Sequence, residues 1–168
     1  MRAYAAACVA MVWTISVVSC TSFPKPFTPH TPDEQAVART VVTFLTAVKT
    51  QDLETLNTLV LPDATMAAFV DGSSEPPQSI LASLLRADDS PLLHAAANKL
   101  VDFRQASPTQ ASVGTYVNDI VNAPSYRGTD QVTTRIRWDL VQRDGQWRIQ
   151  HMAQTIWITP YNAAGAGP

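Results

Sequence analysis

Two side chains near the end of the chain combine an aromatic surface with a group that can transfer protons. Trp138 and His151 lie in two runs of β-branched and aromatic residues within 131–158, and Asp144-Gly145 separates the runs. An Asp-Gly pair favours a two-residue type I′ turn, because both central residues of that turn need a positive φ. The stretch therefore predicts a long antiparallel β-hairpin that holds the two rings on neighbouring strands.

A two-residue loop also fixes which residues face one another across the hairpin. It pairs Trp138 with His151 and Thr134 with Thr155, and side chains alternate between the two faces of a strand. One face is therefore expected to be buried, and it carries Trp138, His151, Thr134, Thr155 and Ile136. The other face is expected to be solvated and carries Arg135, Arg137, Asp139, Arg148, Gln150, Met152 and Gln154.

His151 is the candidate for catalysis, because an imidazole can take up and release a proton near neutral pH. Such a role needs a partner carboxylate, and Asp102 and Asp119 lie in segments that favour strands. The alternative is a core histidine whose ring is satisfied by a backbone carbonyl or by water. The sequence leaves both interpretations open, so no catalytic residue is assigned.

No cofactor and no metal are expected. His30, His94 and His151 are far apart in the sequence, and no pattern places two of them on one metal ion. The chain has no phosphate-binding glycine loop, no dinucleotide fingerprint and no GxSxG motif. The formal net charge is −2, so no excess of positive charge suggests a nucleic acid as partner.

The first twenty residues are typical of an export signal. Arg2 is the only charge before an uncharged run at 3–18, which is short for a membrane-spanning helix. Val17-Val18-Ser19-Cys20 resembles a bacterial lipobox, which implies cleavage before Cys20 and attachment of diacylglycerol to its sulfur. The alternative is an ordinary secretory signal.

A proline-rich segment follows, with four prolines between Thr21 and Pro32. Proline fixes φ and disfavours helix in the residue before it, so we expect an extended tether here. Phe23 and Phe27 either enter the lipid interface or pack on the domain, and the sequence leaves both open. The expected division of the chain is a lipoprotein signal peptide at 1–19, the lipidated cysteine and tether at 20–32, one domain at 33–160 and a flexible tail at 161–168.

Helical spacing precedes strand alternation within the expected domain. Apolar residues at helical spacing predict a first helix from about Thr31 to Thr50, with Pro32 in its first turn. Helices before an antiparallel sheet are an α+β order. Shorter helices are expected at 52–60, 64–70, 79–86 and 91–99, and strands at 100–106 and 111–121 and in the hairpin.

Three pieces of this order resemble a known superfamily. They are residues 36–45, residues 52–56 and the closing Asp144-Gly145-Gln146-Trp147-Arg148-Ile149. They are similar to the nuclear-transport-factor-2-like superfamily, also called SnoaL-like or cystatin-like, over Thr31 to Ile158. The resemblance implies an α+β fold in which N-terminal helices pack on a strongly curved antiparallel sheet around a cone-shaped cavity. It therefore implies a ligand pocket lined by the buried face of the hairpin, with Trp138, His151, Thr134, Thr155 and Ile136. Enzymes of this superfamily often use Asp and His pairs, but no local motif here matches one.

The lipid anchor and the fold together give the expected function. The main interpretation is a lipoprotein anchored to a bacterial membrane, the outer one where a cell has two, with its domain in the periplasm or outside. That domain would bind a small apolar ligand or an envelope protein without catalysis. The alternatives are a SnoaL-like isomerase or hydrolase that uses His151 with an aspartate, and a purely structural subunit of an envelope complex. The expected partners are the membrane, through Cys20, and that ligand or protein, and a homodimer is left open.

Overall fold

The first helix begins where the sequence provides both halves of a capping box. Thr31 Oγ1 accepts a hydrogen bond from the backbone N–H of Glu34, and the Glu34 carboxylate accepts one from the backbone N–H of Thr31. The backbone N–H groups of His30 and Thr31 lower the pKa of Glu34, because they stabilise its charged form. Helix α1 (Pro32–Thr50) ends at Gln51, whose φ is 56°.

The computed structural model describes residues 24–70, 73–85, 99–123 and 128–160, with the backbone alone at 118–123, 128–131 and 159–160. The elements that follow α1 are α2 (Leu53–Leu59), β1 (Val60–Val70), β2 (Ser73–Ser74), β3 (Gln78–Ser79), α3 (Ile80–Leu84), β4 (Lys99–Ser107), β5 (Gln110–Ala123), β6 (Gly128–Arg143) and β7 (Gln146–Pro160). The expected helix at 91–99 and the expected tail lie outside the described residues, apart from Lys99.

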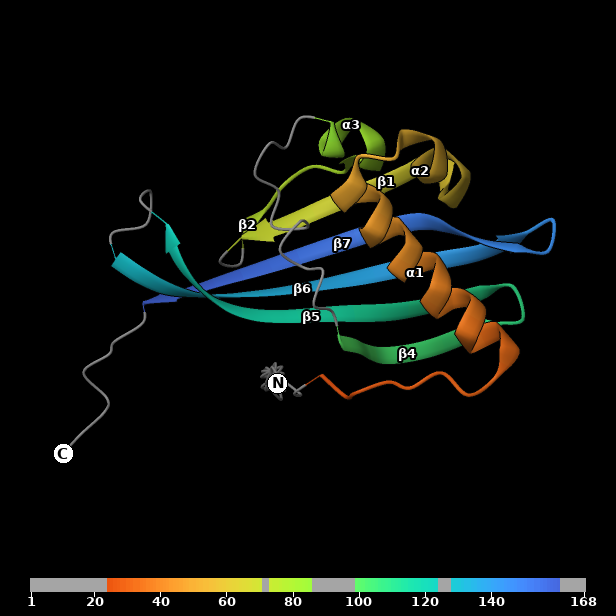
Figure 1. Ribbon diagram of the computed structural model, residues 1–168, viewed down its shortest axis with the longest axis horizontal. Helices are drawn as coiled ribbons and strands as arrows, with labels where there is room; N and C mark the ends of the chain where they lie inside the picture. The colour runs from red at the N-terminus through yellow and green to blue at the C-terminus, as the bar shows by residue number, and fades with distance from the viewer. Residues whose placement is uncertain (1–23, 71–72, 86–98, 124–127, 161–168) are drawn as a thin grey trace, which may run out of the picture.

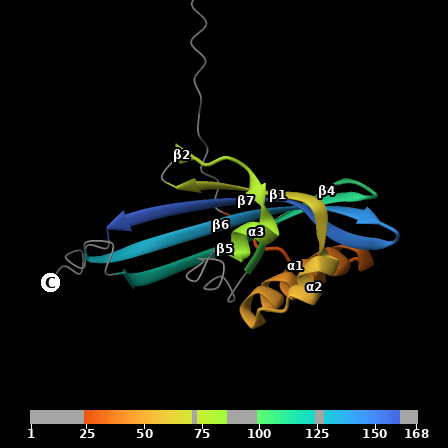
Figure 2. The same ribbon diagram turned by 90° about the horizontal axis from the view of Figure 1, so that it is seen from above.

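The strands form one curved, seven-stranded sheet in the order β2-β1-β7-β6-β5-β4, and β3 pairs with β1 beside this path. β1 runs parallel to β7, whereas the other pairings are antiparallel, so the sheet is mixed. Helices α1, α2 and α3 lie on one side of the sheet (Figures 1 and 2). We call this side the inner face and the opposite side the outer face. The α+β order predicted from the sequence is confirmed.

Helix α1 builds the core against the inner face. Val37, Val41 and Phe44 have no exposed surface, and Phe44 meets the ring of Trp138 edge to face, with 5.1 Å between the ring centroids. Trp138 is fully buried, and its Nε1 donates a hydrogen bond to Thr115 Oγ1 over 3.1 Å. The indole of the hairpin is therefore a core side chain with a fixed orientation.

The hairpin forms, but one extra residue changes its register. Asp144 and Gly145 both have positive φ, as the predicted turn requires, and Leu140 pairs with Ile149 as expected. Gln150 is then left without a partner in a β-bulge, so Asp139 instead of Trp138 pairs with His151. Beyond the bulge the side chains of β7 from His151 to Trp157 lie on the face opposite to the predicted one, because side-chain direction alternates with a period of two.

The helix predicted at 64–70 is wrong, because this segment belongs to strand β1. Its alanines and its methionine favour helix locally, but β1 lies beside β7 and pairs with it in parallel from Thr65 to Val70. Pairing with a long neighbouring strand outweighs the local preference here. This strand is also the reason why the sheet is mixed and not antiparallel throughout.

The proline-rich segment is attached to the sheet over the part that the structure describes. The backbone N–H of Phe27 donates to the Leu100 carbonyl, and that of Asp102 to the Lys25 carbonyl, each over 2.9 Å. The rings of Phe27 and Phe103 stack with centroids 4.6 Å apart. Residues 24–30, which we call the strap, thus cover the β4 edge. None of the helices in the described ranges is long and apolar enough to cross a membrane.

Candidate functional site

The inner face of the sheet carries a short row of buried polar side chains beyond the helix-covered core. Thr115, Thr134 and Gln154 are only 1%, 5% and 6% exposed. Thr115 on β5 and Gln154 on β7 both pair with Ile136 on β6, so the three residues form one row across the sheet. Thr134 lies two residues from Ile136 on β6, on the same face. The three strands therefore bring these side chains together in one small area.

The hydrogen bonds within this row are incomplete. Thr115 already accepts the bond from the Trp138 indole, whereas Gln154 Nε2 is buried and has no hydrogen-bond partner. A buried amide donor without a partner costs about 1–3 kcal/mol. Such a group fits a site where the acceptor is supplied by a bound molecule.

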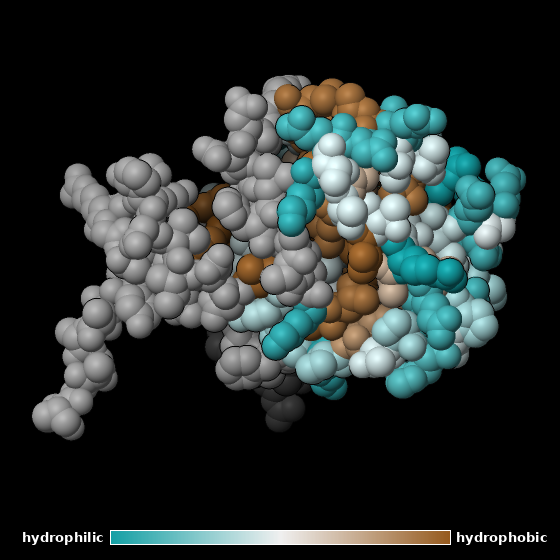
Figure 3. Space-filling view, viewed as in Figure 1, coloured by the Kyte–Doolittle hydropathy of each residue, from teal (hydrophilic) through white to brown (hydrophobic). Residues whose placement is uncertain are grey.

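The surroundings of this polar row are apolar. Ile136 and Met152 are buried beside it, and Val117 is partly buried against the same core. In Figure 3, which views the helix side, hydrophobic residues lie in the middle of the described surface with polar residues around them. An apolar surface with a few directed polar groups suits a small, largely apolar molecule that carries one hydrogen-bonding oxygen.

The structure divides the predicted pocket between the two faces of the sheet. Trp138, Ile136 and Thr134 lie on the inner face, as expected from their alternation on β6. His151 and Thr155 lie on the outer face, because both follow the Gln150 bulge. The prediction that Trp138 and His151 are side by side on one face is therefore wrong.

His151 has a polar neighbour, but neither predicted carboxylate is beside it. Its Nδ1 lies 2.8 Å from the hydroxyl of Thr65 on β1, and its backbone partner on β6 is Asp139. Asp102 lies on β4 and accepts a hydrogen bond from Arg135. Asp119 lies on β5, where its backbone pairs with Val132. The structure describes only the backbone of Asp119.

Gln154 is the residue that the sequence argument missed. It was placed on the solvated face, because a continuous register gives it the same direction as Gln150. A β-bulge leaves no reliable pattern in a single sequence, since the flanking residues keep their strand character on both sides of it. His30 is exposed in the strap, and His94 lies outside the described residues. No three His, Cys, Asp or Glu side chains gather as a ligand set for a metal ion in the described ranges.

Comparison with known proteins gives a family and a fold. A family model for a SnoaL-like domain matches residues 29–153. No curated protein matches the chain. The dehydrochlorinase LinA-type3 from Novosphingobium barchaimii, named for hexachlorocyclohexane, has a similar structure, with a TM-score of 0.54, 13% identity, and coverage of 78% of this chain and 91% of that one.

Two other solved structures have the same fold. A ketosteroid isomerase-like protein from Erwinia carotovora atroseptica gives a TM-score of 0.52 at 12% identity, covering 76% of this chain and 98% of that one. An uncharacterized protein with a cystatin-like fold from Caulobacter vibrioides gives a TM-score of 0.50 at 20% identity, covering 79% of this chain and 92% of that one. At these identities the likeness shows the fold alone.

The comparisons correct the expected function. The main interpretation was a non-catalytic ligand- or protein-binding accessory of the cell envelope. None of the three similar structures is described as an envelope protein or a lipoprotein, and the names of two of them refer to enzymes. Together with the SnoaL-like domain match, this makes the non-catalytic envelope role wrong as the main interpretation. The enzymatic alternative has the better support.

Proposed function

We propose, from the premise that this chain belongs to the SnoaL-like domain family, that it is an enzyme that moves a proton on a small, largely apolar substrate. Isomerases and lyases perform such steps. The observation that carries the proposal is the unpaired amide of Gln154, buried beside Thr134 on an otherwise apolar stretch of the inner face. A substrate oxygen would provide the acceptor that this amide lacks.

The chemistry of proton removal explains why such an amide is useful. When a proton leaves the carbon next to a carbonyl group, negative charge develops on the carbonyl oxygen. Side-chain amides and hydroxyls that are already oriented toward that oxygen stabilise the charge, and removal of one such donor costs about 10²–10³-fold in rate. Gln154 Nε2 and the hydroxyl of Thr134 are the two donors that we assign to this task.

The proton also needs an acceptor, and a carboxylate is the usual choice. The inner-face residues Thr115, Thr134 and Gln154 cannot supply one. We propose Asp119, which lies on β5 two residues beyond Val117, as the residue to test for this role. His151 is left out of the mechanism because its ring lies on the outer face with Thr65.

The proposal is tested by a reaction that does not require the natural substrate. Purified protein is incubated in D₂O with 1-tetralone, 3-cyclohexenone and a Δ5-3-ketosteroid, and loss of the proton signals next to the carbonyl is followed by NMR. We expect faster exchange with the wild-type protein on at least one ketone. Gln154→Leu should lower this rate by about 10²-fold, Thr134→Val should lower it less, and Asp119→Asn should abolish it.

His151→Ala is the matched control, since it removes a polar side chain from β7 on the opposite face. It should leave the exchange rate unchanged. Exchange that survives Gln154→Leu and Thr134→Val together, or that is lost with His151→Ala, would contradict the assignment. Ketones that bind but show no exchange would contradict catalysis itself.

We also propose that the chain is lipidated at Cys20 and attached to a bacterial membrane through that group, as the lipobox-like residues 17–20 suggest. Metabolic labelling with an alkyne analogue of palmitate tests this in the producing bacterium. The two cysteines of the chain provide a matched pair, because Cys8→Ala should keep the label and Cys20→Ala should lose it. Label that persists in Cys20→Ala would count against the lipobox.

A further inference from the structure

The outer face of the sheet contains a groove of about 540 Å³ that the proposed reaction does not use. Its floor runs across the middle strands, where backbone pairing places Gly114, Arg137 and Ala153 in one row. Gly114 and Ala153 present almost no side chain to this row. The volume lies within the range of about 300–1,000 Å³ that small-molecule sites occupy.

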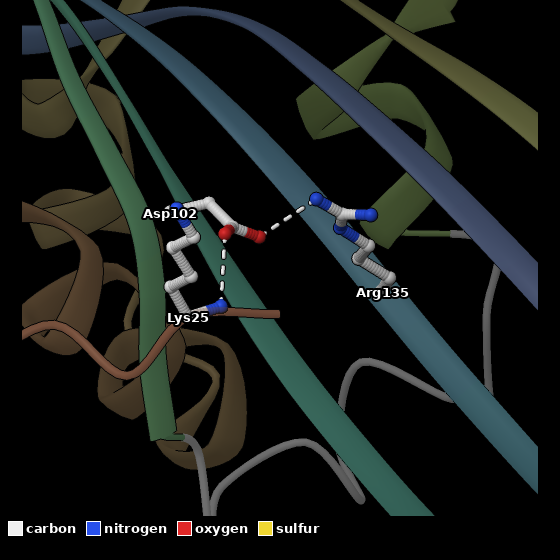
Figure 4. Close-up of polar contacts among 3 residues, drawn as sticks. All are labelled: Lys25, Asp102 and Arg135. Carbon is white, nitrogen blue, oxygen red and sulfur yellow. Dashed lines mark hydrogen bonds and ion pairs between the residues drawn. The ribbon is translucent and has the colours of Figure 1, made fainter. Parts of the chain in front are cut away.

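Two ion pairs fix the longer side chains of this groove. Arg135 leans toward β4, where its Nη2 donates to Asp102 Oδ2 over 2.7 Å (Figure 4). Arg137 Nη2 donates to Asp139 Oδ2, two residues further along β6, over 3.0 Å. Each of the two guanidinium groups is thereby held in place by one carboxylate that also lines the groove.

The charge of the groove is positive although that of the chain is negative. Arg104, Arg135 and Arg137 line it together with Asp102 and Asp139, so three positive and two negative groups give a formal charge of +1. The whole chain has a formal charge of −2. A guanidinium group has five N–H donors, and the ion pairs with Asp102 and Asp139 use few of them. Donors therefore remain for an anion.

Aromatic side chains border the same groove. Trp157 is 41% exposed, which is unusual for an indole, and Phe69 is partly buried. Backbone pairing places Phe69 beside Thr155 on β7, with Trp157 two residues further along that strand. A flat apolar group that lies on this floor would cover the exposed part of Trp157 while its charged end reaches an arginine.

We propose that this outer groove is a binding site for a planar organic anion, in which a carboxylate or sulfonate contacts the arginines and an aromatic body packs against Trp157. The site is separate from the inner-face row, because the sheet itself lies between them. Small floor residues, two ion pairs, an excess of positive charge and an exposed indole come together in this groove.

Binding of 1-naphthoate tests the proposal. Isothermal titration calorimetry gives the affinity, and tryptophan emission reports contact with Trp157, since the other two indoles of the described residues, Trp138 and Trp147, are buried. We expect submillimolar binding, and 1-naphthamide, which is neutral, should bind about tenfold more weakly because charge-assisted hydrogen bonds are lost. Arg104→Gln and Arg137→Gln should each raise Kd about 3- to 10-fold, and Trp157→Ala should weaken binding and abolish the emission change.

Arg143→Gln is the matched control, since Arg143 is an exposed arginine of the same strand that does not line the groove. It should leave Kd unchanged, and Gln154→Leu should do so as well. Equal affinity for 1-naphthamide, equal weakening by Arg143→Gln, or loss of binding with Gln154→Leu would each overturn the proposal. Absence of binding would overturn the proposal as well. If sedimentation then shows a dimer, a second copy of the chain covers the groove in place of an anion.

Discussion

Gly114 is the residue on which both the outer groove and the packing of β4 depend. A Cβ atom at this position would lie 2.9 Å from Val101 Cγ2 and 3.3 Å from the Val101 carbonyl oxygen. Val101 is 3% exposed, so it has little room to move away. The missing side chain therefore allows β4 to bend over β5, and it also leaves the floor of the groove open.

Gly114→Ala should for this reason destabilise the fold by about 1–3 kcal/mol, the usual cost of an added methyl group in a packed interior. Urea denaturation followed by tryptophan fluorescence measures the change. The double variant Gly114→Ala with Val101→Ala removes the clashing methyl groups, so its loss should be smaller than the sum of the two single losses. Strictly additive losses would show that the contact with Val101 is not the cause.

Gln150 shows where prediction from the sequence fails at the scale of one residue. The turn residues Asp144 and Gly145 were identified from their preference for positive φ, and the structure confirms that both have a positive φ. The register predicted beyond Ile149 was wrong, because a bulge reverses the direction of the side chains of β7 from His151 to Trp157. For that single reason His151 lies on the outer face and Gln154 on the inner face, each opposite to its predicted face. The candidate site changed with them.

The strap at residues 24–30 can be tested at the scale of one element. Phe27→Ala removes the stacked ring that packs on Phe103, a contact worth about 0.5–1.5 kcal/mol. We expect faster hydrogen exchange at the amides of Phe27 and Asp102, which donate to Leu100 and Lys25 respectively. Mass spectrometry of the corresponding peptides measures it, and the amides of β6 serve as the internal control. Unchanged exchange at both amides would mean that the backbone bonds alone hold the strap.

Elements were predictable where local signals and packing agreed. Helix α1 has its capping box, its early acids and an apolar stripe that faces the sheet, so its bounds followed from the sequence. Part of strand β1 was predicted as helix because its residues favour helix locally. It forms a strand because it pairs with β7. The strap was expected to be extended, which is correct, but its pairing with β4 depends on residues more than seventy positions away.

At the scale of the whole molecule, the sequence predicted the fold class, and the pockets had to come from the coordinates. A hydrophobic pattern tells which residues are buried, and Trp138 and Ile136 were assigned correctly in this way. It does not tell which polar atoms lack partners, as at Gln154, or where small residues leave a groove, as at Gly114. Both features depend on the register of several strands at once.

Asp102 links two parts of the molecule through its two carboxylate oxygens. Oδ1 accepts the backbone N–H of Lys25 in the strap, and Oδ2 accepts Arg135 in the groove. Its φ of 52° shows that β4 holds it in a conformation that few residues other than glycine adopt. An anion that binds Arg135 in place of Asp102 would remove one of the two hydrogen bonds of this carboxylate. The remaining hydrogen bond, from the backbone N–H of Lys25, would change in strength as a result. Thermodynamic reciprocity then requires that release of the strap change the affinity for the anion by the same factor.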